Sequence, residues 1–174
     1  AKIAKKEAGL HPQRVGFYKQ LISQNDLVFD VGANLGNRIE VFLDIKTKVI
    51  AVEPQPSCVE VLKKKFGDKI IIEQMALGAA PGIATLHIAD KNTISSLSSD
   101  FINRTKQTRF KRNKWENKLE VTVVSIESLI KKYGLPKFCK IDVEGFENEV
   151  LKGLETPLPC LYFEYCVPEM IDNA

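Results

Sequence analysis

The alternation of short apolar runs with helix-forming stretches constrains the fold of this chain more than any other feature of its sequence. Runs rich in Val, Ile, Leu and Phe predict strands at residues 27–31, 48–52, 69–73, 137–141 and 160–165. Strands that alternate with helical stretches are typical of a parallel sheet whose strands are joined by helical crossovers. The sequence therefore predicts an α/β fold with a doubly wound, mostly parallel sheet and helices on both faces.

The connecting segments carry helix signals of their own. Helices are predicted at residues 10–23, through Ile39 and Leu43, at 57–66, from Ser125 to near Gly134, and at 147–152. Ser125 is a typical N-cap residue, and Gly134 is a typical residue at a helix end. Residues 82–88 and 119–124 alternate in polarity and predict two extra strands. We expect one domain over residues 1–174, with an N-terminal helical region at 1–24 and a basic loop at 103–118.

The composition is that of an ordinary globular protein. Hydrophobic residues make up 44% and charged residues 27% of the 174 residues. No apolar run approaches the ~18 residues that a membrane span needs, so we expect no membrane association. The four cysteines, at positions 58, 139, 160 and 166, lack metal-binding spacing. They are interpreted as reduced thiols, which favours a cytoplasmic location. The chain begins without Met, which is consistent with a portion of a longer protein.

Acidic residues and glycines gather where the predicted strands end. Along the chain these residues are Asp30, Gly32, Gly36, Glu53, Asp142, Glu144 and Glu164. The carboxyl ends of parallel strands meet at one edge of a sheet, and ligands bind there where the strand order reverses. The sequence therefore predicts a ligand site at this edge.

The loop at 30–36 narrows the class of ligand. Its glycines allow backbone amides to approach a ligand beside a helix N-terminus. Glu53 closes the strand–helix–strand unit at a position where an acid hydrogen-bonds ribose hydroxyls. The glycine spacing is G-x-x-x-G, which does not match a dinucleotide or triphosphate loop. A nucleoside without phosphates is therefore favoured, and an NAD-dependent dehydrogenase is disfavoured.

In these motifs the chain resembles the S-adenosylmethionine-dependent methyltransferases of class I, and among them the FkbM family. The segments that carry the resemblance are VFDVGANLG (28–36), VIAVEP (49–54), ALG (76–78), SSL (95–97), KIDVEGFENEVLKG (140–153) and YFEY (162–165). The resemblance covers roughly residues 20–168 and implies a Rossmann-like methyltransferase sheet.

The resemblance assigns roles to individual residues. S-adenosyl-L-methionine is the implied cofactor, and its methionine part would lie against Asp30, Gly32, Ala33, Asn34 and Gly36. Glu53 would bind the ribose hydroxyls, Met75 and Ala76 would flank the adenine, and the serines at 95–99 would lie near the active site. Asp142 is expected to contact the cofactor or the acceptor.

Asp142 and Glu144 are the predicted catalytic residues. A hydroxyl is a poor nucleophile at neutral pH, so a carboxylate base within hydrogen-bond reach would assist its methylation. Glu144 is assigned as this base or as a contact to the acceptor hydroxyl; the alternative is that it caps the following helix. A D-x-E pair could also ligate Mg²⁺, but the sequence shows no third ligand. No metal is therefore predicted.

The acceptor implied by the resemblance is a hydroxyl on a sugar or secondary metabolite. Residues 103–118 hold seven Lys or Arg and one acid, a local charge of +6 within an overall +3. This segment has three open interpretations: a solvated loop, a lid for an anionic substrate, or a nucleic-acid contact. One alternative function is an RNA methyltransferase that uses residues 104–118. Another is a non-catalytic nucleoside-binding module, which would lack turnover because the C-terminal strands are absent.

The predicted fifth strand lies close to the end of the chain. Sheets of the resembled class continue with further strands, whereas this sequence ends at Ala174. We expect the sheet to lack these C-terminal strands, or the chain to be part of a longer protein. An uncovered edge strand invites pairing with another chain. A homo-oligomer through this edge is therefore expected.

Overall fold

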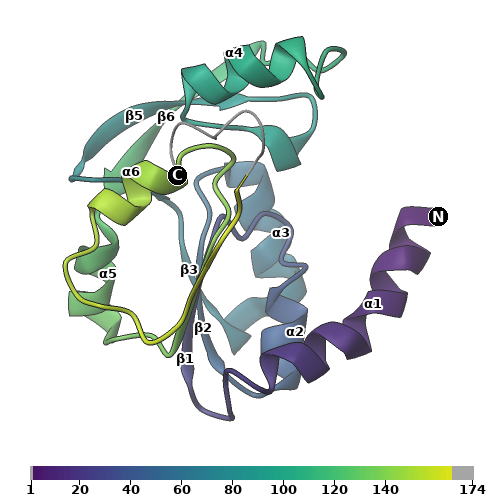
Figure 1. The fold of residues 1–174 in the computed structure, drawn as a ribbon, viewed down its shortest axis with the longest axis vertical. Coiled ribbons are helices and arrows are strands. Elements are labelled where there is room, and N and C mark those ends of the chain that lie inside the picture. Colours follow the sequence, from purple (N-terminus) through teal and green to yellow (C-terminus); the bar gives the residue numbers. More distant parts are fainter. Residues whose placement is uncertain (1, 166–174) are drawn as a thin grey trace.

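The computed structural model describes the backbone of residues 2–165 and the side chains from Leu10 to Tyr165 (Figure 1). Its centre is a parallel sheet of five strands in the order β3-β2-β1-β7-β8. The strands are β1 (Leu27–Val31), β2 (Lys48–Val52), β3 (Ile71–Glu73), β7 (Phe138–Ile141) and β8 (Leu161–Phe163). The strand order reverses between β1 and β7. The predicted doubly wound α/β fold is confirmed.

Helices cover both faces of this sheet. On one face lie α1 (Lys2–Tyr18), α2 (Ile39–Asp44) and α3 (Pro56–Phe66), which enclose a core with Tyr18, Phe42 and Leu62. On the other face lie α5 (Ile126–Tyr133) and α6 (Glu147–Lys152), with Ile126 and Val150 buried against the strands (Figure 1). The central strands are apolar in nearly every position because both of their faces are covered.

Local signals set several of the element boundaries. The Ser125 side chain accepts a hydrogen bond from the Ser128 amide and caps α5, which ends at Gly134 with a positive φ of 96°. Several boundaries differ from the prediction, and among them the fifth strand, predicted at 160–165, covers only Leu161–Phe163. The first helix occupies Lys2–Tyr18 rather than 10–23. The third strand starts at Ile71, because Gly67–Lys69 forms a short 3₁₀ helix, η1.

A smaller sheet stands above the carboxyl edge of the central one. Its strands β4 (Ala76–Leu77), β6 (Asn117–Val124) and β5 (Gly82–Ile88) pair in that order, with β5 antiparallel to β6. Between β5 and β6 the chain forms η2 (Asn92–Ile94) and α4 (Ser99–Gln107). In Figure 1 this unit occupies the top of the molecule.

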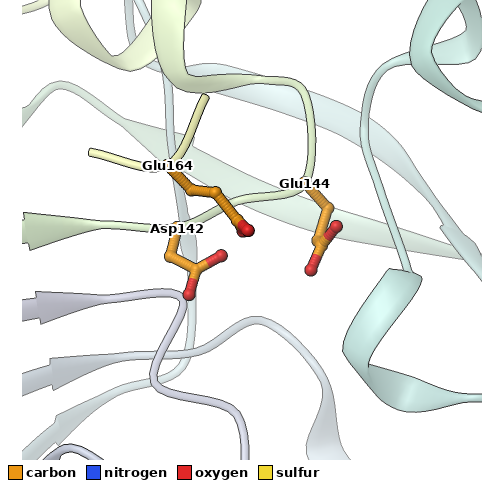
Figure 2. A group of neighbouring side chains, drawn as sticks. All are labelled: Asp142, Glu144 and Glu164. Atoms are coloured by element: carbon orange, nitrogen blue, oxygen red, sulfur yellow. The ribbon is translucent and has the colours of Figure 1, made fainter. Parts of the chain in front are cut away.

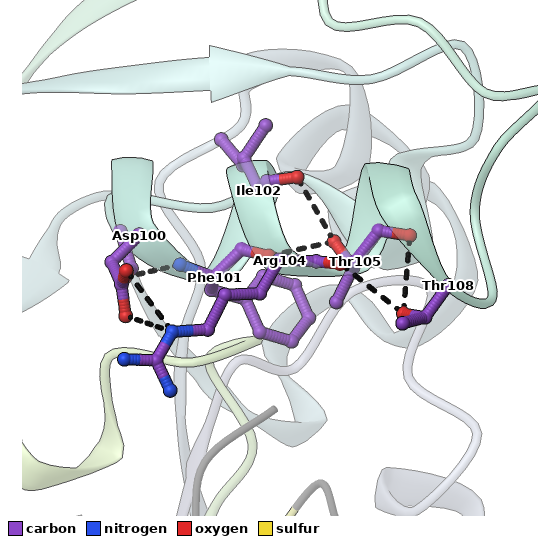
Figure 3. Close-up of polar contacts among 7 residues, drawn as sticks. Asp100, Phe101, Ile102, Arg104, Thr105 and Thr108 are labelled. Carbon is purple, nitrogen blue, oxygen red and sulfur yellow. Dashed lines mark hydrogen bonds and ion pairs between the residues drawn. The ribbon is translucent and has the colours of Figure 1, made fainter. Parts of the chain in front are cut away.

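The basic segment is not the single loop predicted at 103–118. Its first residues complete α4, and its last two begin β6, so the loop spans only 108–116. Ser98 caps α4 by accepting from the Phe101 amide, and Figure 3 shows Arg104 paired with Asp100 and the Thr105 hydroxyl donating to the Phe101 carbonyl. The helix forms because its apolar face packs into a small core of its own.

That small core also fixes the loop beyond α4. Trp115 is buried and donates its indole N–H to the Ile94 carbonyl at 2.9 Å. Lys106 lies over the Trp115 ring, with its Nζ 5.2 Å from the ring centroid. The aromatic residues of the segment are thus packing groups in the structure. The predicted nucleic-acid contact stays a prediction.

β8 forms the edge of the described sheet. Within residues 2–165 no strand pairs with its outer side, and Tyr162 and Phe163 are exposed. The homo-oligomer through this edge stays a prediction. Among the described helices, none has the length and apolar character that crossing a membrane requires.

Candidate active site

A cavity of about 240 Å³ opens at the carboxyl ends of β1, β2 and β7, where the strand order reverses. All the residues predicted for the cofactor and for catalysis line it, except Gly36. The lining ones are Asp30, Gly32, Ala33, Asn34, Glu53, Met75, Ala76, Asp142 and Glu144. Residues of the smaller sheet and of η2 also line it, together with Ser95, which follows η2. The fold thus brings the scattered polar groups to one place.

Two glycines of the loop after β1 serve different purposes. Gly32 has a φ of 75°, and a Cβ there would lie 1.8 Å from the Asp142 carbonyl oxygen. Only glycine therefore allows this loop to pass the end of β7. Gly36 has a φ of 78°, and its missing Cβ makes room for the Phe66 ring. The structure places Gly36 in helix packing and not at the cavity.

We expect Gly32→Ala to lower the free energy of unfolding by about 3 kcal/mol or more, because both the positive φ and the Asp142 carbonyl oppose a side chain. Urea denaturation measures this. The matched control is Gly16→Ala in α1, where a Cβ meets nothing within 4 Å. Alanine should leave stability there unchanged or raise it by up to about 1 kcal/mol. Equal effects at the two positions would contradict the role assigned to Gly32.

Glu53 is held in place by two backbone amides. Its carboxylate is 2% exposed and accepts from Asn34 N and from Gln55 N, each at 2.8 Å. Burial raises the pKa of Glu53, and these two amides offset part of that rise. Each oxygen keeps a lone pair beyond the amide it accepts from. Glu53 therefore sits as a fixed hydrogen-bond acceptor in the cavity wall, unlike a solvated acid at a strand end.

A buried lysine joins the two central strands. Lys140 is 4% exposed, and its Nζ lies 3.2 Å from Asp30 Oδ1 and 3.2 Å from Asp142 Oδ2. Burial alone would lower the pKa of Lys140, but the two carboxylates outweigh it and the pKa is raised. Burial raises the pKa of Asp30, and Lys140 counteracts this. No sequence motif assigns a role to Lys140, and the signal for one is a lysine inside the apolar run before Asp142.

Three carboxyl groups meet beside this lysine. Asp142, Glu144 and Glu164 point toward one another (Figure 2), with one oxygen from each within 4.8 Å of the others. Glu164 was noted at the strand end but not assigned a role. It reaches the group because β8 pairs with β7. The predicted absence of a metal stays a prediction, although the structure supplies a third carboxylate that the sequence did not reveal.

The three carboxyl groups differ in proton affinity. Burial, followed by the charges of Glu164 and Asp142, raises the pKa of Glu144 to about 8. A hydrogen bond with Asp142, followed by burial, raises the pKa of Glu164 to about 7. Burial would raise the pKa of Asp142 as well, but Lys140 prevails and the pKa is lowered. At neutral pH the group therefore holds an ionised Asp142 beside a mostly protonated Glu144.

The loop that carries Glu144 is fixed from two sides. Glu144 has a φ of 53°, and its carbonyl accepts from Ser96 Oγ at 2.6 Å. On the other side, the Glu147 carboxylate accepts from the amides of Val143 and Gly145. Glu147, not Glu144, thus binds the amides that precede α6, so the interpretation of Glu144 as a helix cap is wrong. The Glu144 side chain is left to face the cavity.

The positive charges of the cavity come from unexpected places. Beside Lys140, the lining cations are Arg14 of α1 and Arg38 at the start of α2, and the described lining includes no residue of 103–118. No motif singled out either arginine. The basic segment therefore contributes nothing to the described cavity wall.

Comparisons with known proteins identify a family and several similar proteins. The family model described as the methyltransferase FkbM domain matches residues 30–170. The methyltransferase sdnD of Sordaria araneosa is 27% identical over 164 residues, which cover 77% of this chain. The chain spans 62% of that relative's length. Among solved structures, the C-terminal domain of precorrin-6Y C5,15-methyltransferase from Rhodobacter capsulatus is 12% identical with a TM-score of 0.33, covering 64% of this chain and 88% of that one.

Proposed function

The chain belongs to the FkbM methyltransferase domain family, and on this premise we propose that it transfers a methyl group from S-adenosylmethionine to a hydroxyl oxygen of a small acceptor, such as a sugar or a secondary metabolite. The observation that carries the proposal is the single cavity that joins the fixed acceptor Glu53 to the carboxyl groups of Asp142 and Glu144. Glu53 can accept hydrogen bonds from the nucleoside, and the carboxyl groups can bind the reacting hydroxyl and accept its proton.

The nucleoside half of the cofactor fits the end of the cavity that follows β2 and β3. Glu53 would accept hydrogen bonds from the ribose hydroxyls with the lone pairs that its two amides leave over. Met75 is half-buried and Ala76 is buried, and both line the same cavity. They offer apolar surface to the adenine. These roles follow the family resemblance, and the burial and amide contacts of Glu53 support them.

The transfer itself is an in-line displacement. When bound, S-adenosylmethionine would supply an electrophilic methyl group on sulfur, and the acceptor oxygen would displace S-adenosylhomocysteine from it. The carboxylate of Glu144 would accept the hydroxyl proton. With a pKa of about 8, ionised Glu144 is a stronger base than an ordinary glutamate.

Cofactor binding tests the first half of the proposal. We expect S-adenosylhomocysteine to bind at micromolar Kd and NAD to bind far more weakly in calorimetry. Glu53→Ala should raise the Kd of S-adenosylhomocysteine by about 10- to 100-fold, because losing a buried hydrogen-bond partner costs about 1–3 kcal/mol. Glu60→Ala, an exposed acid of α3, is the matched control and should bind like the wild type.

An analogue separates the ribose role from a general defect. The 2′-deoxy analogue of S-adenosylhomocysteine lacks one hydroxyl that Glu53 would bind. Wild-type protein should bind the analogue less tightly than the parent, whereas Glu53→Ala should hardly distinguish the two. If the variant still discriminates as strongly as the wild type, Glu53 does not bind that hydroxyl. If the wild type binds no S-adenosyl compound, the proposed function is wrong.

A further inference from the structure

The cavity contains an arginine that the proposed function has not used. Arg38 directly precedes α2, is half-buried and lines the cavity. Among the described residues its guanidinium makes no hydrogen bond and no ion pair, whereas the Lys140 ammonium pairs with two carboxylates. A guanidinium desolvated in part without a partner is poised for an anion from outside the chain.

The position of Arg38 is defined by the groups on which its charge acts. Burial raises the pKa values of Asp30 and Tyr18, and the charge of Arg38 opposes part of each rise. The same charge adds to the lowering of the Asp142 pKa that Lys140 causes. Asp30 is the penultimate residue of β1 and Asp142 follows β7, so Arg38 acts on the β1–β7 side of the site. Glu53 follows β2, on the other side of β1. The two ends of the cavity therefore differ in charge. Glu53, which would accept hydrogen bonds from the nucleoside, lies at one end, and the cation of Arg38 lies at the other.

The N-terminal helix adds a second cation to the same end. Arg14 also lines the cavity and lies four residues before Tyr18 in α1. Residues four apart share one face of a helix, so Arg14 and Tyr18 face the same way. Because Arg38 acts on Tyr18, both arginines border this end. Arg14 lies before residue 30, where the match to the family model begins.

We propose that Arg38, flanked by Arg14, binds the carboxylate of the amino-acid end of S-adenosylmethionine. The inference rests on the proposed function, because it concerns the cofactor of that reaction. With the adenosine placed by Glu53, the amino-acid end extends toward β1 and β7. There the carboxylate would meet the ionised Asp142, whose charge repels it, so a cation is needed to hold it. A planar guanidinium binds a carboxylate through two parallel hydrogen bonds, which fixes the cofactor's orientation as well as its affinity.

The test compares two ligands that differ only in the carboxylate. The Kd of S-adenosylhomocysteine and of its decarboxylated analogue are measured by calorimetry for wild type and Arg38→Gln. We expect Arg38→Gln to raise the Kd of S-adenosylhomocysteine by about 10- to 100-fold. Binding of the analogue should stay unchanged or tighten, since a repelling cation is removed. The Kd of S-adenosylhomocysteine for Arg38→Lys should lie between those for wild type and Arg38→Gln, because lysine keeps the positive charge but lacks the planar guanidinium.

A control variant and two alternative outcomes show whether the inference on Arg38 holds. Arg112→Gln, an exposed arginine of the 108–116 loop, is the matched control and should bind both ligands normally. Equal weakening of both ligands in Arg38→Gln would mean that Arg38 only shapes the cavity, and would overturn the inference. An unchanged Kd for S-adenosylhomocysteine with a raised KM for the acceptor would also overturn it, because the anion bound would then be the acceptor's. In both cases the proposed function still stands, provided that the wild-type protein binds S-adenosylhomocysteine.

Discussion

Replacing Glu144 with Gln should reduce methyl transfer by about 100- to 10,000-fold, the range that a general base contributes. Glutamine has the same shape and resembles the protonated carboxyl group that prevails at neutral pH, so cofactor binding should hardly change. The loss is therefore expected in kcat at saturating S-adenosylmethionine, measured as S-adenosylhomocysteine released. Glu155→Gln, an exposed acid on the loop after α6, is the matched control.

The pH profile of the wild type gives an independent check on the same residue. A base must be deprotonated to accept the hydroxyl proton, and the pKa of Glu144 is raised to about 8. The rate should thus rise with pH up to about 8 and level off above it, and Glu144→Gln should lose this rising limb. A rising limb that persists in the variant would assign the base to another group, and Glu164, with its pKa near 7, would be the next residue to replace.

Stability against pH shows whether Glu144→Gln keeps the fold. The pKa of Glu144 lies near 4.5 in an ordinary setting and near 8 in the folded protein, so the folded state binds its proton more tightly. The contribution of Glu144 to the free energy of unfolding is therefore complete below 4.5 and is lost as the pH rises toward 8. Glu144→Gln should remove this loss. At pH 8 the variant is expected to be at least as stable as the wild type.

Replacing Lys140 with Met should lower the free energy of unfolding by about 3–5 kcal/mol, because it leaves a buried charge without its partner. Asp30 is 1% exposed, and within the described part of the chain neither of its oxygens has a hydrogen-bond partner apart from the ion pair with Lys140. Lys137→Met, at an exposed position just before β7, is the matched control and should change stability by less than about 0.5 kcal/mol.

Two measurements separate the lost charge pair from a packing defect. In Lys140→Met, Asp30 can recover by taking up a proton, since burial raises its pKa. The destabilisation in urea should therefore be smaller at pH 5 than at pH 8. The double variant Lys140→Met with Asp30→Asn should regain part of the lost stability at pH 8. A destabilisation that is independent of pH and untouched by the second substitution would contradict the role assigned to the ion pair.

Much of the fold followed from local sequence signals. The strands at 27–31 and 48–52, the helix between Ser125 and Gly134 and the helix at 147–152 appear where the pattern placed them. Apolar runs and caps act within a few residues, so they can be recognised without tertiary contacts. The first residues of the basic segment belong to α4 rather than to the predicted loop, because its charges obscure the few apolar residues that bury one face of that helix.

The sequence by itself determined the order of strands and helices, the glycine loop and the edge at which Asp30, Glu53 and Asp142 meet. These features depend on chain geometry that repeats every two or 3.6 residues and on strands that run parallel. Only the tertiary structure decided that Lys140 pairs with Asp30, that Glu164 joins Glu144, and that Arg14 and Arg38 border one end of the cavity. Those contacts join residues far apart in the chain. The resulting proton affinities depend on burial and on distance through space, which no local pattern contains.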